Sequence, residues 1–151
     1  MKIKISADST CDLSKELVEK NDISIVPLFV SLGSENLLDG ETIHPQDIYN
    51  YYASTKKLPK TGARSIEEYS DFFRNILTSG YDAIVHFTIS SDMSSSYNNA
   101  QKAAAKFRNV YVVDSRTLST GIGLLVLDAC DMVEIGMDAQ SIANRAQARS
   151  G

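Results

Sequence analysis

The chain has 151 residues, of which 43% are hydrophobic and 23% are charged, and its formal net charge is -4. This length allows one domain with a real core, and the composition is typical of a globular protein. Lysines and arginines are scattered, which argues against nucleic-acid binding. No stretch is long and apolar enough to predict a signal peptide or a membrane-inserted helix.

The titratable residues predict neither a metal site nor a cofactor. Cys11 and Cys130 are far apart and match no metal or redox spacing. We interpret them as free thiols in a reducing compartment, and therefore expect a cytoplasmic protein. The two histidines, His44 and His86, have no cluster of cysteines and carboxylates beside them in the sequence.

The first third of the chain predicts two strands, a helix between them and a hairpin. Residues 2–7 alternate and place Ile3, Ile5 and Ala7 on one strand face. Ser9, Thr10, Asp12 and Ser14 are candidate caps for a helix that ends near residue 21. The elements expected after it are a strand over 23–30 that contains Pro27, an irregular hairpin with turn signals at Gly33 and Asp39-Gly40, and a helix opened by Pro45.

The rest of the chain alternates between helices and apolar strands. Residues 56–65 predict a loop, and Ser65 is a candidate cap for the helix after it. We expect strands over 83–89 and 110–113 and helices over 66–77, 94–106, 119–134 and 138–149. This alternation predicts βαβ units, and so a three-layer α/β/α domain with a mostly parallel sheet.

The helix expected near residues 118–133 is apolar on two sides. One side carries Leu118, Ile122, Leu125, Val126 and Ala129, and the other carries Leu124, Leu127 and Cys130. A helix that is apolar nearly all round is covered on both sides. We therefore expect a further partner surface on its outer side.

Five serines, at positions 90, 91, 94, 95 and 96, lie where a strand passes into a helix. Plain N-capping is one interpretation, but it needs one serine for each helix. The other is an anion site, in which hydroxyls join the unpaired N–H groups of the first helical turn. Ligands of open parallel sheets bind at the carboxyl ends of the strands, where these serines are expected.

The sequence lacks the motifs of several common nucleotide-binding and catalytic sites. It contains no GxxxxGK[ST], no GxSxG, and no GxGxxG placed after a strand. His86 falls inside an apolar strand and is interpreted as a core imidazole rather than a base. No catalytic constellation is visible, so the sequence does not predict an enzyme.

Four stretches in order, DSTCDL, LPKTGARS, ISSDMSSSYNNA and VVDSRTLSTGIG, resemble the signature segments of the amino-terminal half of the DegV family. These are bacterial fatty-acid-binding proteins that present acyl chains to a fatty acid kinase. The resemblance covers essentially all 151 residues. It implies a non-catalytic carrier for a long-chain fatty acid such as palmitate, with the lipid in a tunnel between two domains.

The resemblance also implies the residues that hold the fatty-acid carboxylate. Thr61 and Ser65 fall on the family's TSQPS-like pattern, and Ser94, Ser95 and Ser96 fall on its SGTY stretch. The expected donors are the Thr61 and Ser94 hydroxyls, with the N–H groups of Ser95 and Ser96. Ser95 replaces a glycine of the family, and Gly62-Ala63-Arg64 replaces the middle of the first motif. For Arg64, contact with the anion and a solvent-facing position are both open.

The family's second domain has no counterpart in residues 1–151, which are expected to form the amino-terminal lipid-binding domain. Its absence fits a helix that is apolar on two sides, and it also allows self-association through that face. Two alternatives stay open: a binding protein or enzyme for a phosphorylated metabolite that uses the serine corners, and a folded domain that binds no ligand alone.

Overall fold

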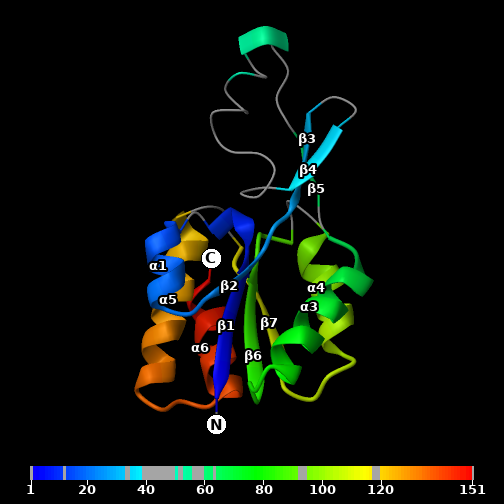
Figure 1. Ribbon diagram of the computed structural model, residues 1–151. Helices are drawn as coiled ribbons and strands as arrows, with labels where there is room; N and C mark the ends of the chain where they lie inside the picture. Colours follow the sequence, from blue (N-terminus) through cyan, green and yellow to red (C-terminus); the bar gives the residue numbers. More distant parts are fainter. Residues whose placement is uncertain are drawn as a thin grey trace.

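The computed structural model describes residues 2–11, 13–32, 35–38, 50, 53–55, 60–62, 64–91, 95–116 and 120–150. A four-stranded parallel sheet lies between two layers of helices, which confirms the three-layer α/β/α arrangement (Figure 1). In the order β2-β1-β6-β7, its strands are β2 (Ser24–Val26), β1 (Ile3–Asp8), β6 (Ala83–Thr88) and β7 (Val110–Asp114).

The helices divide between the two faces of this sheet. On one side lie α1 (Lys15–Lys20), α5 (Thr120–Glu134) and α6 (Ala139–Arg149), and on the other lie α3 (Ile66–Thr78) and α4 (Ser96–Ala104) (Figure 1). Alternate residues of each strand point to opposite faces. Ile5, Ala7, Val85 and Phe87 therefore join the core under α5 and α6, whereas Ile84 joins the core under α3 and α4.

The strand expected over residues 23–30 is instead two strands in two different sheets. Pro27 separates β2 from β3 (Phe29–Leu32), because a proline has no N–H to donate to a ladder. β2 is an edge strand, as the proline indicated. β3 is the middle strand of a small antiparallel sheet with β4 (Glu35–Leu38) and β5 (Lys60–Gly62) (Figure 1).

Of the local structures expected between residues 29 and 65, one is changed and one is confirmed. The loop over residues 56–65 contains β5, whose Thr61 pairs with Val30, so that prediction was wrong for residues 60–62. β3 and β4 confirm the hairpin, although Gly33 and the Asp39-Gly40 turn lie outside the described residues. Pro45 also lies outside them; residues 50 and 53–55 are helical.

The segment after β1 begins with a 3₁₀ turn, η1 (Ser9–Cys11), and not with the α-helix directly. α1 starts at Lys15 because the Ser14 hydroxyl accepts a hydrogen bond from the N–H of Leu17. The other helices match their expected ranges to within about two residues. The capping residue of α3 is Ser65, as predicted.

The helix expected to be apolar on two sides is α5, and the partner surface expected on its outer side stays a prediction. On its inner side Ile122, Val126 and Ala129 are fully buried. On the other side Cys130 is also buried, whereas 67% of Leu124 is exposed. None of the helices in the described part of the chain combines the length and apolarity that crossing a bilayer demands.

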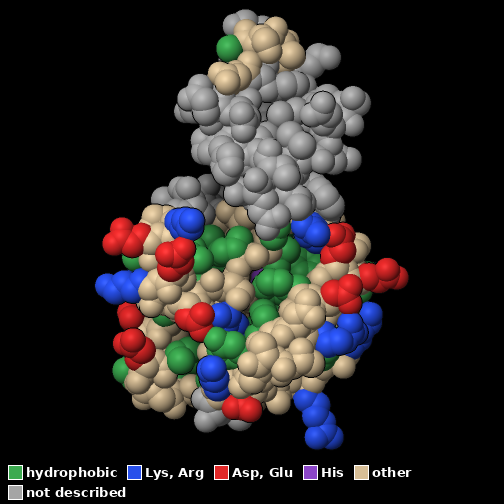
Figure 2. Space-filling model, in the orientation of Figure 1, with side chains coloured by type: hydrophobic (Ala, Val, Ile, Leu, Met, Phe, Trp, Pro, Cys, Tyr) green, Lys and Arg blue, Asp and Glu red, His purple; other side chains and the backbone are tan. Residues whose placement is uncertain are grey.

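Charged side chains of both signs lie along the helical flanks of the face seen in Figure 2. Acidic and basic side chains both appear on each flank. A strongly basic stripe is the usual electrostatic footprint of a nucleic-acid-binding surface, and this face carries none.

Candidate functional site

The carboxyl ends of β1, β6 and β7 meet at one edge of the parallel sheet, below the small antiparallel sheet (Figure 1). At the end of β1 the Ser9 hydroxyl accepts a hydrogen bond from the N–H of Leu28, at 3.0 Å. At the end of β7 the Asp114 Oδ1 accepts hydrogen bonds from the N–H groups of Ser91 and Arg116. The serine-rich segment after β6 and the segment after β7 are therefore in direct contact.

The serines at the start of α4 have different roles. Ser95 occupies the N-cap position, but its exposed side chain makes no capping hydrogen bond. Ser96, by contrast, is fully buried. Ser94 lies outside the described residues. The simple capping interpretation therefore does not account for Ser95.

The serine that precedes α3 is a true cap. The Ser65 hydroxyl accepts from the N–H of Glu68, at 3.1 Å, and the Glu68 carboxylate accepts from the N–H of Ser65, also at 3.1 Å. This reciprocal pair forms a capping box. Burial acts to raise the pKa of Glu68, but hydrogen bonds from Arg64 and Ser65 outweigh it and lower that pKa.

Arg64 fastens the segment that carries Thr61 to its surroundings. Its Nε donates to the Glu68 carboxylate at 2.7 Å, and its Nη1 donates to the carbonyl oxygen of Pro27 at 2.9 Å. Its own carbonyl oxygen accepts from the side-chain amide of Asn99, on α4, at 2.9 Å. Only 19% of the Arg64 side chain is exposed, so it is neither a free solvent-facing group nor an uncommitted cation.

These contacts bring the two resemblance-based motifs into one region. The Asn99 amide joins α4 to a residue only three positions after Thr61, whose backbone lies in β5. Ser95 and Ser96 begin the same helix α4. The contact between Asn99 and Arg64 thus links α4, one turn after Ser95, to the segment that follows Thr61.

A buried polar group that sequence reasoning missed lies beneath this region. Ser6 and His86 are paired across β1 and β6, with 2.7 Å between Ser6 Oγ and His86 Nδ1. Asp8 Oδ1 lies 3.1 Å from His86 Nε2 and 2.8 Å from the Tyr69 hydroxyl. None of these four side chains has measurable exposure. The core imidazole expected for His86 is confirmed, but its carboxylate partner was not foreseen.

One signal in the sequence pointed to this group. Lys4, Ser6 and Asp8 alternate with the apolar residues of β1, and together they make one face of the strand polar. An alternating strand normally turns its polar face to water. Here α3 and α4 cover that face, so its polar residues need partners inside the protein.

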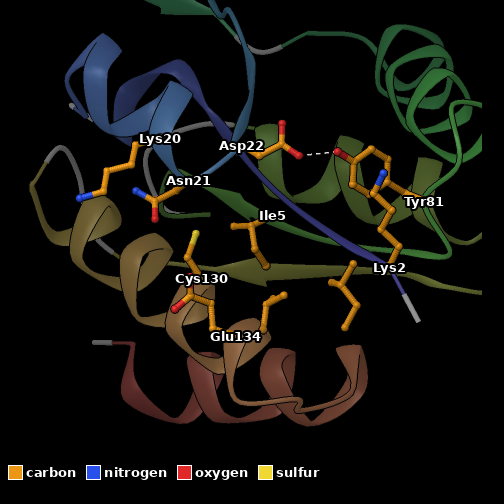
Figure 3. Close-up of a pocket in the computed structure, with 10 residues that line it drawn as sticks. Lys2, Ile5, Lys20, Asn21, Asp22, Tyr81, Cys130 and Glu134 are labelled. Atoms are coloured by element: carbon orange, nitrogen blue, oxygen red, sulfur yellow. Dashed lines mark hydrogen bonds between the residues drawn. The ribbon is translucent and has the colours of Figure 1, made fainter.

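The cavity in Figure 3 lies at the opposite end of β1. It has a volume of about 330 Å³ and lies between the start of β1, the end of α1 and the end of α5. Lys2, Lys20, Asp22 and Glu134 line it together with apolar residues that include Ile5. Because the mixed charges favour no one class of ligand, we assign it no function.

A second hollow, of about 420 Å³, lies beside the carboxyl end of β7 between α5 and α6. Arg116, Leu124 and Arg149 contribute to its wall, and Arg149 is paired with Asp128 at 3.0 Å. Across the described ranges, no three His, Cys, Asp or Glu side chains form a group able to hold a metal ion.

The fold defines a class of protein: a three-layer α/β domain with a small antiparallel sheet above the carboxyl edge of its parallel sheet. The DegV family model, described as "Uncharacterised protein, DegV family", matches residues 2–150. The chain therefore belongs to the DegV family, which confirms the resemblance of the four sequence stretches.

Relatives and solved structures agree with this assignment. A DegV domain-containing protein of Clostridium perfringens is 34% identical over 143 residues, which cover 93% of this chain and 51% of that protein. A fatty-acid-binding DegV family protein from Thermus thermophilus superimposes with a TM-score of 0.88 at 30% identity, covering 98% of this chain and 53% of that one. A stearic acid-binding protein from Eubacterium ventriosum gives a TM-score of 0.86 at 36% identity, covering 97% and 52%. The chain spans about half the length of these proteins.

Proposed function

We propose that this chain is the head-group-binding part of a non-catalytic fatty-acid carrier. In this proposal the protein presents the carboxylate of a long-chain fatty acid to a fatty acid kinase, which forms the acyl phosphate. The observation that supports it most is the similarity, at 36% identity and over 97% of the chain, to a stearic acid-binding protein. The free, buried cysteines fit the cytoplasm, where such a carrier would work.

The proposed head-group site consists of Thr61, Ser94 and Ser95, with the N–H groups at the start of α4. Two observations support it: the Asn99 amide holds the Thr61 segment against α4, and the Ser95 hydroxyl is not used for capping. N–H groups in the first turn of a helix have no partner within it and favour an anion. Arg64 and Ser65 serve this site as clamp and cap, because their side chains are already hydrogen-bonded.

The acyl chain and the carboxylate of the fatty acid make different contributions to binding. Burying about 14 methylenes of palmitate at ~0.8 kcal/mol each contributes roughly 11 kcal/mol before association costs. Each hydrogen bond to the carboxylate contributes about 1.5–3 kcal/mol, much of it offset by removing water from the anion. The acyl chain therefore sets affinity, while the hydroxyl and N–H donors determine where the carboxylate lies. A carrier needs donors that fix the position of the carboxylate, because its partner enzyme must bind that group in one defined position.

Native mass spectrometry tests this function. The longest product of the gene and residues 1–151 are each expressed in bacteria, purified and then titrated with palmitate. A co-purified acyl chain, or uptake of added palmitate, is the expected result for the longer form. If the longer form carries no lipid and takes up none, the proposal is wrong. Thermal stabilisation by sugar phosphates or nucleotides, and not by fatty acids, would favour the phosphorylated-metabolite alternative.

A double variant tests the role of the donors. Thr61→Val with Ser94→Ala is expected to reduce transfer to the kinase more than it reduces lipid retention, because the tail contacts stay intact. Acyl-phosphate formation and palmitate affinity are measured on the same preparations. Equal losses in the two assays would contradict the division between tail and head group.

A further inference from the structure

The carboxylate of Asp114, at the end of β7, holds two segments of the chain at once. Its Oδ1 accepts a hydrogen bond from the N–H of Arg116 at 3.0 Å and another from the N–H of Ser91 at 3.2 Å. The first bond lies within the corner that follows β7, whereas the second joins that corner to the serine-rich segment after β6. One half-buried side chain therefore fixes the paths by which both segments leave the sheet.

The bond to Arg116 has a local cause. Arg116 has a φ of 58°, a left-handed backbone conformation that residues with a Cβ seldom adopt. An aspartate that accepts from the N–H two residues later forms an Asx turn, which stabilises a reversal of this kind. Asp114 thus keeps the corner in shape, and the same oxygen also accepts the N–H of Ser91.

The backbone of Asp114 is held in turn by Gln147, on α6. Oε1 of Gln147 accepts from the N–H of Asp114, and its Nε2 donates to the carbonyl oxygen of Asp114, both at 3.0 Å. β7 is an edge strand of the parallel sheet, and the Gln147 amide takes the place that the peptide group of a further strand would have. Nε2 also donates to the Ser150 hydroxyl at 3.0 Å, so the orientation of the amide is determined.

The helix that follows the serine-rich segment is also held in place. Ser95 occupies the N-cap position of α4, and one turn later the Asn99 amide donates to the carbonyl oxygen of Arg64 at 2.9 Å. Ser91 and Ser95 are only four residues apart, and each residue extends the chain by at most about 3.6 Å. Anchoring Ser91 at Asp114 therefore restricts where the chain can enter α4.

We propose that Asp114 is a positioning residue for the head-group site, and that it acts by fixing Ser91 and, through it, the start of α4. This inference rests on the proposed function. Gln147 supports Asp114 in this role from α6. The property that matters is an acceptor oxygen at the position of Oδ1, and not the negative charge of the carboxylate.

The test uses palmitate and hexadecanol, two ligands that share a tail but differ in the head group, on the longest product of the gene. Asp114→Ala removes the acceptor, whereas Asp114→Asn keeps an oxygen in its place without the charge. Asp114→Ala is expected to weaken palmitate binding roughly five- to twentyfold and to change hexadecanol binding by less than about twofold. Asp114→Asn should stay within about twofold of the parent for both ligands.

Asp128→Ala is the matched control. Asp128 is an exposed aspartate on α5 that lines the same hollow as Arg116, and its carboxylate is paired with Arg149. The substitution removes a carboxylate from the same side of the domain but leaves the contact with Ser91 intact. It should alter the binding of neither ligand. A loss of palmitate binding as large as that of Asp114→Ala would show that the effect is not specific to position 114, and the inference would be wrong.

The other outcomes are equally definite. If Asp114→Ala weakens both ligands equally or neither, the positioning role is wrong while the carrier function stands. The same holds if Asp114→Asn weakens palmitate binding as much as Asp114→Ala does, or strengthens it, because the charge would then be the property that matters. If the parent protein binds no palmitate, the proposed function fails, and this inference fails with it.

Amide hydrogen exchange provides a second readout that needs no ligand. The N–H groups of Ser91 and Arg116 should exchange faster in Asp114→Ala than in the parent, and Asp114→Asn should restore their protection. Should Asp114→Ala not fold, Gln147→Ala releases the Asp114 backbone from α6 and is expected to accelerate exchange at the same two groups. Unchanged exchange at Ser91 in the folded variant would overturn the inference.

Discussion

Gly123 on α5 approaches the carbonyl oxygen of Cys11 so closely that a Cβ at this position would lie 2.8 Å from that oxygen. The same Cβ would lie 3.1 Å from Cδ2 of Leu13. α5 thus packs directly on the 3₁₀ turn that follows β1. The second glycine of the GIG sequence is explained by helix packing.

This contact predicts that Gly123→Ala destabilises the protein. Alanine normally favours a helix over glycine by about 1 kcal/mol, but the Cβ would overlap a backbone atom that cannot move alone. We expect a net loss of roughly 1–3 kcal/mol in the free energy of unfolding, measured in urea. Gly80→Ala is the comparison: it has open space around it but a φ of 111°, so it reports backbone strain alone. A Gly123→Ala variant as stable as the parent would contradict the packing.

Replacing each of the two N-cap serines with alanine should destabilise the protein to a different extent. Ser65→Ala should cost about 1 kcal/mol of stability, because it breaks the capping box with Glu68. Ser95→Ala should cost less than about 0.5 kcal/mol, because its hydroxyl makes no capping bond. Thermal and urea unfolding of both variants are the measurement. Equal losses would show that Ser95 caps α4 in solution.

Asp22 predicts a small pH dependence of stability. A hydrogen bond from Tyr81, and after it one from Lys4, lowers the pKa of Asp22 below its ordinary value of 3.8. The stabilisation is therefore present above that value and is lost as the pH falls through the folded-state pKa. Asp22→Asn should lower stability by at most about 1 kcal/mol at pH 7, because the aspartate is largely exposed.

Asparagine is the suitable replacement because Asp22 has a φ of 54°, a conformation that Asn tolerates. The difference between parent and variant should shrink as the pH drops below about 4. Urea unfolding at several pH values measures it. A difference that stays constant from pH 7 to pH 2 would contradict the role of the charge.

The Cys130 thiol is expected to react slowly with thiol reagents in the folded protein. Burial, and after it the nearby Asp131 and Glu134 carboxylates, raise the pKa of Cys130 to about 11, so the thiol keeps its proton at neutral pH. Cys11 is a second buried thiol that forms no disulfide. Both should react with a thiol reagent on unfolding and only slowly before it, because the thiolate is the nucleophile. Rapid labelling of Cys130 in the folded protein, followed by mass spectrometry, would contradict this.

Local patterns were sufficient for most of the elements. The apolar runs of β6 and β7, the alternation of β1 and the cap Ser65 predicted their strands and helix, because each depends on neighbouring residues alone. The strand β5 was missed because its three residues carry no pattern of their own. It is a strand only because β3, some thirty residues earlier, provides its partner.

The candidate site was predictable as a set of motifs but not as an arrangement. The sequence by itself determined the family, the alternation of strands and helices in the parallel α/β part, and the serine-rich start of α4. Only the tertiary structure decided that the polar face of β1 is buried. Two helices cover this face, whereas the polar face of an alternating strand is usually exposed to water. Once Asp8 is removed from water it must find partners, and His86 and Tyr69 reach it from 78 and 61 residues away. Such pairings depend on how the layers close over the sheet, which no local stretch of the sequence specifies.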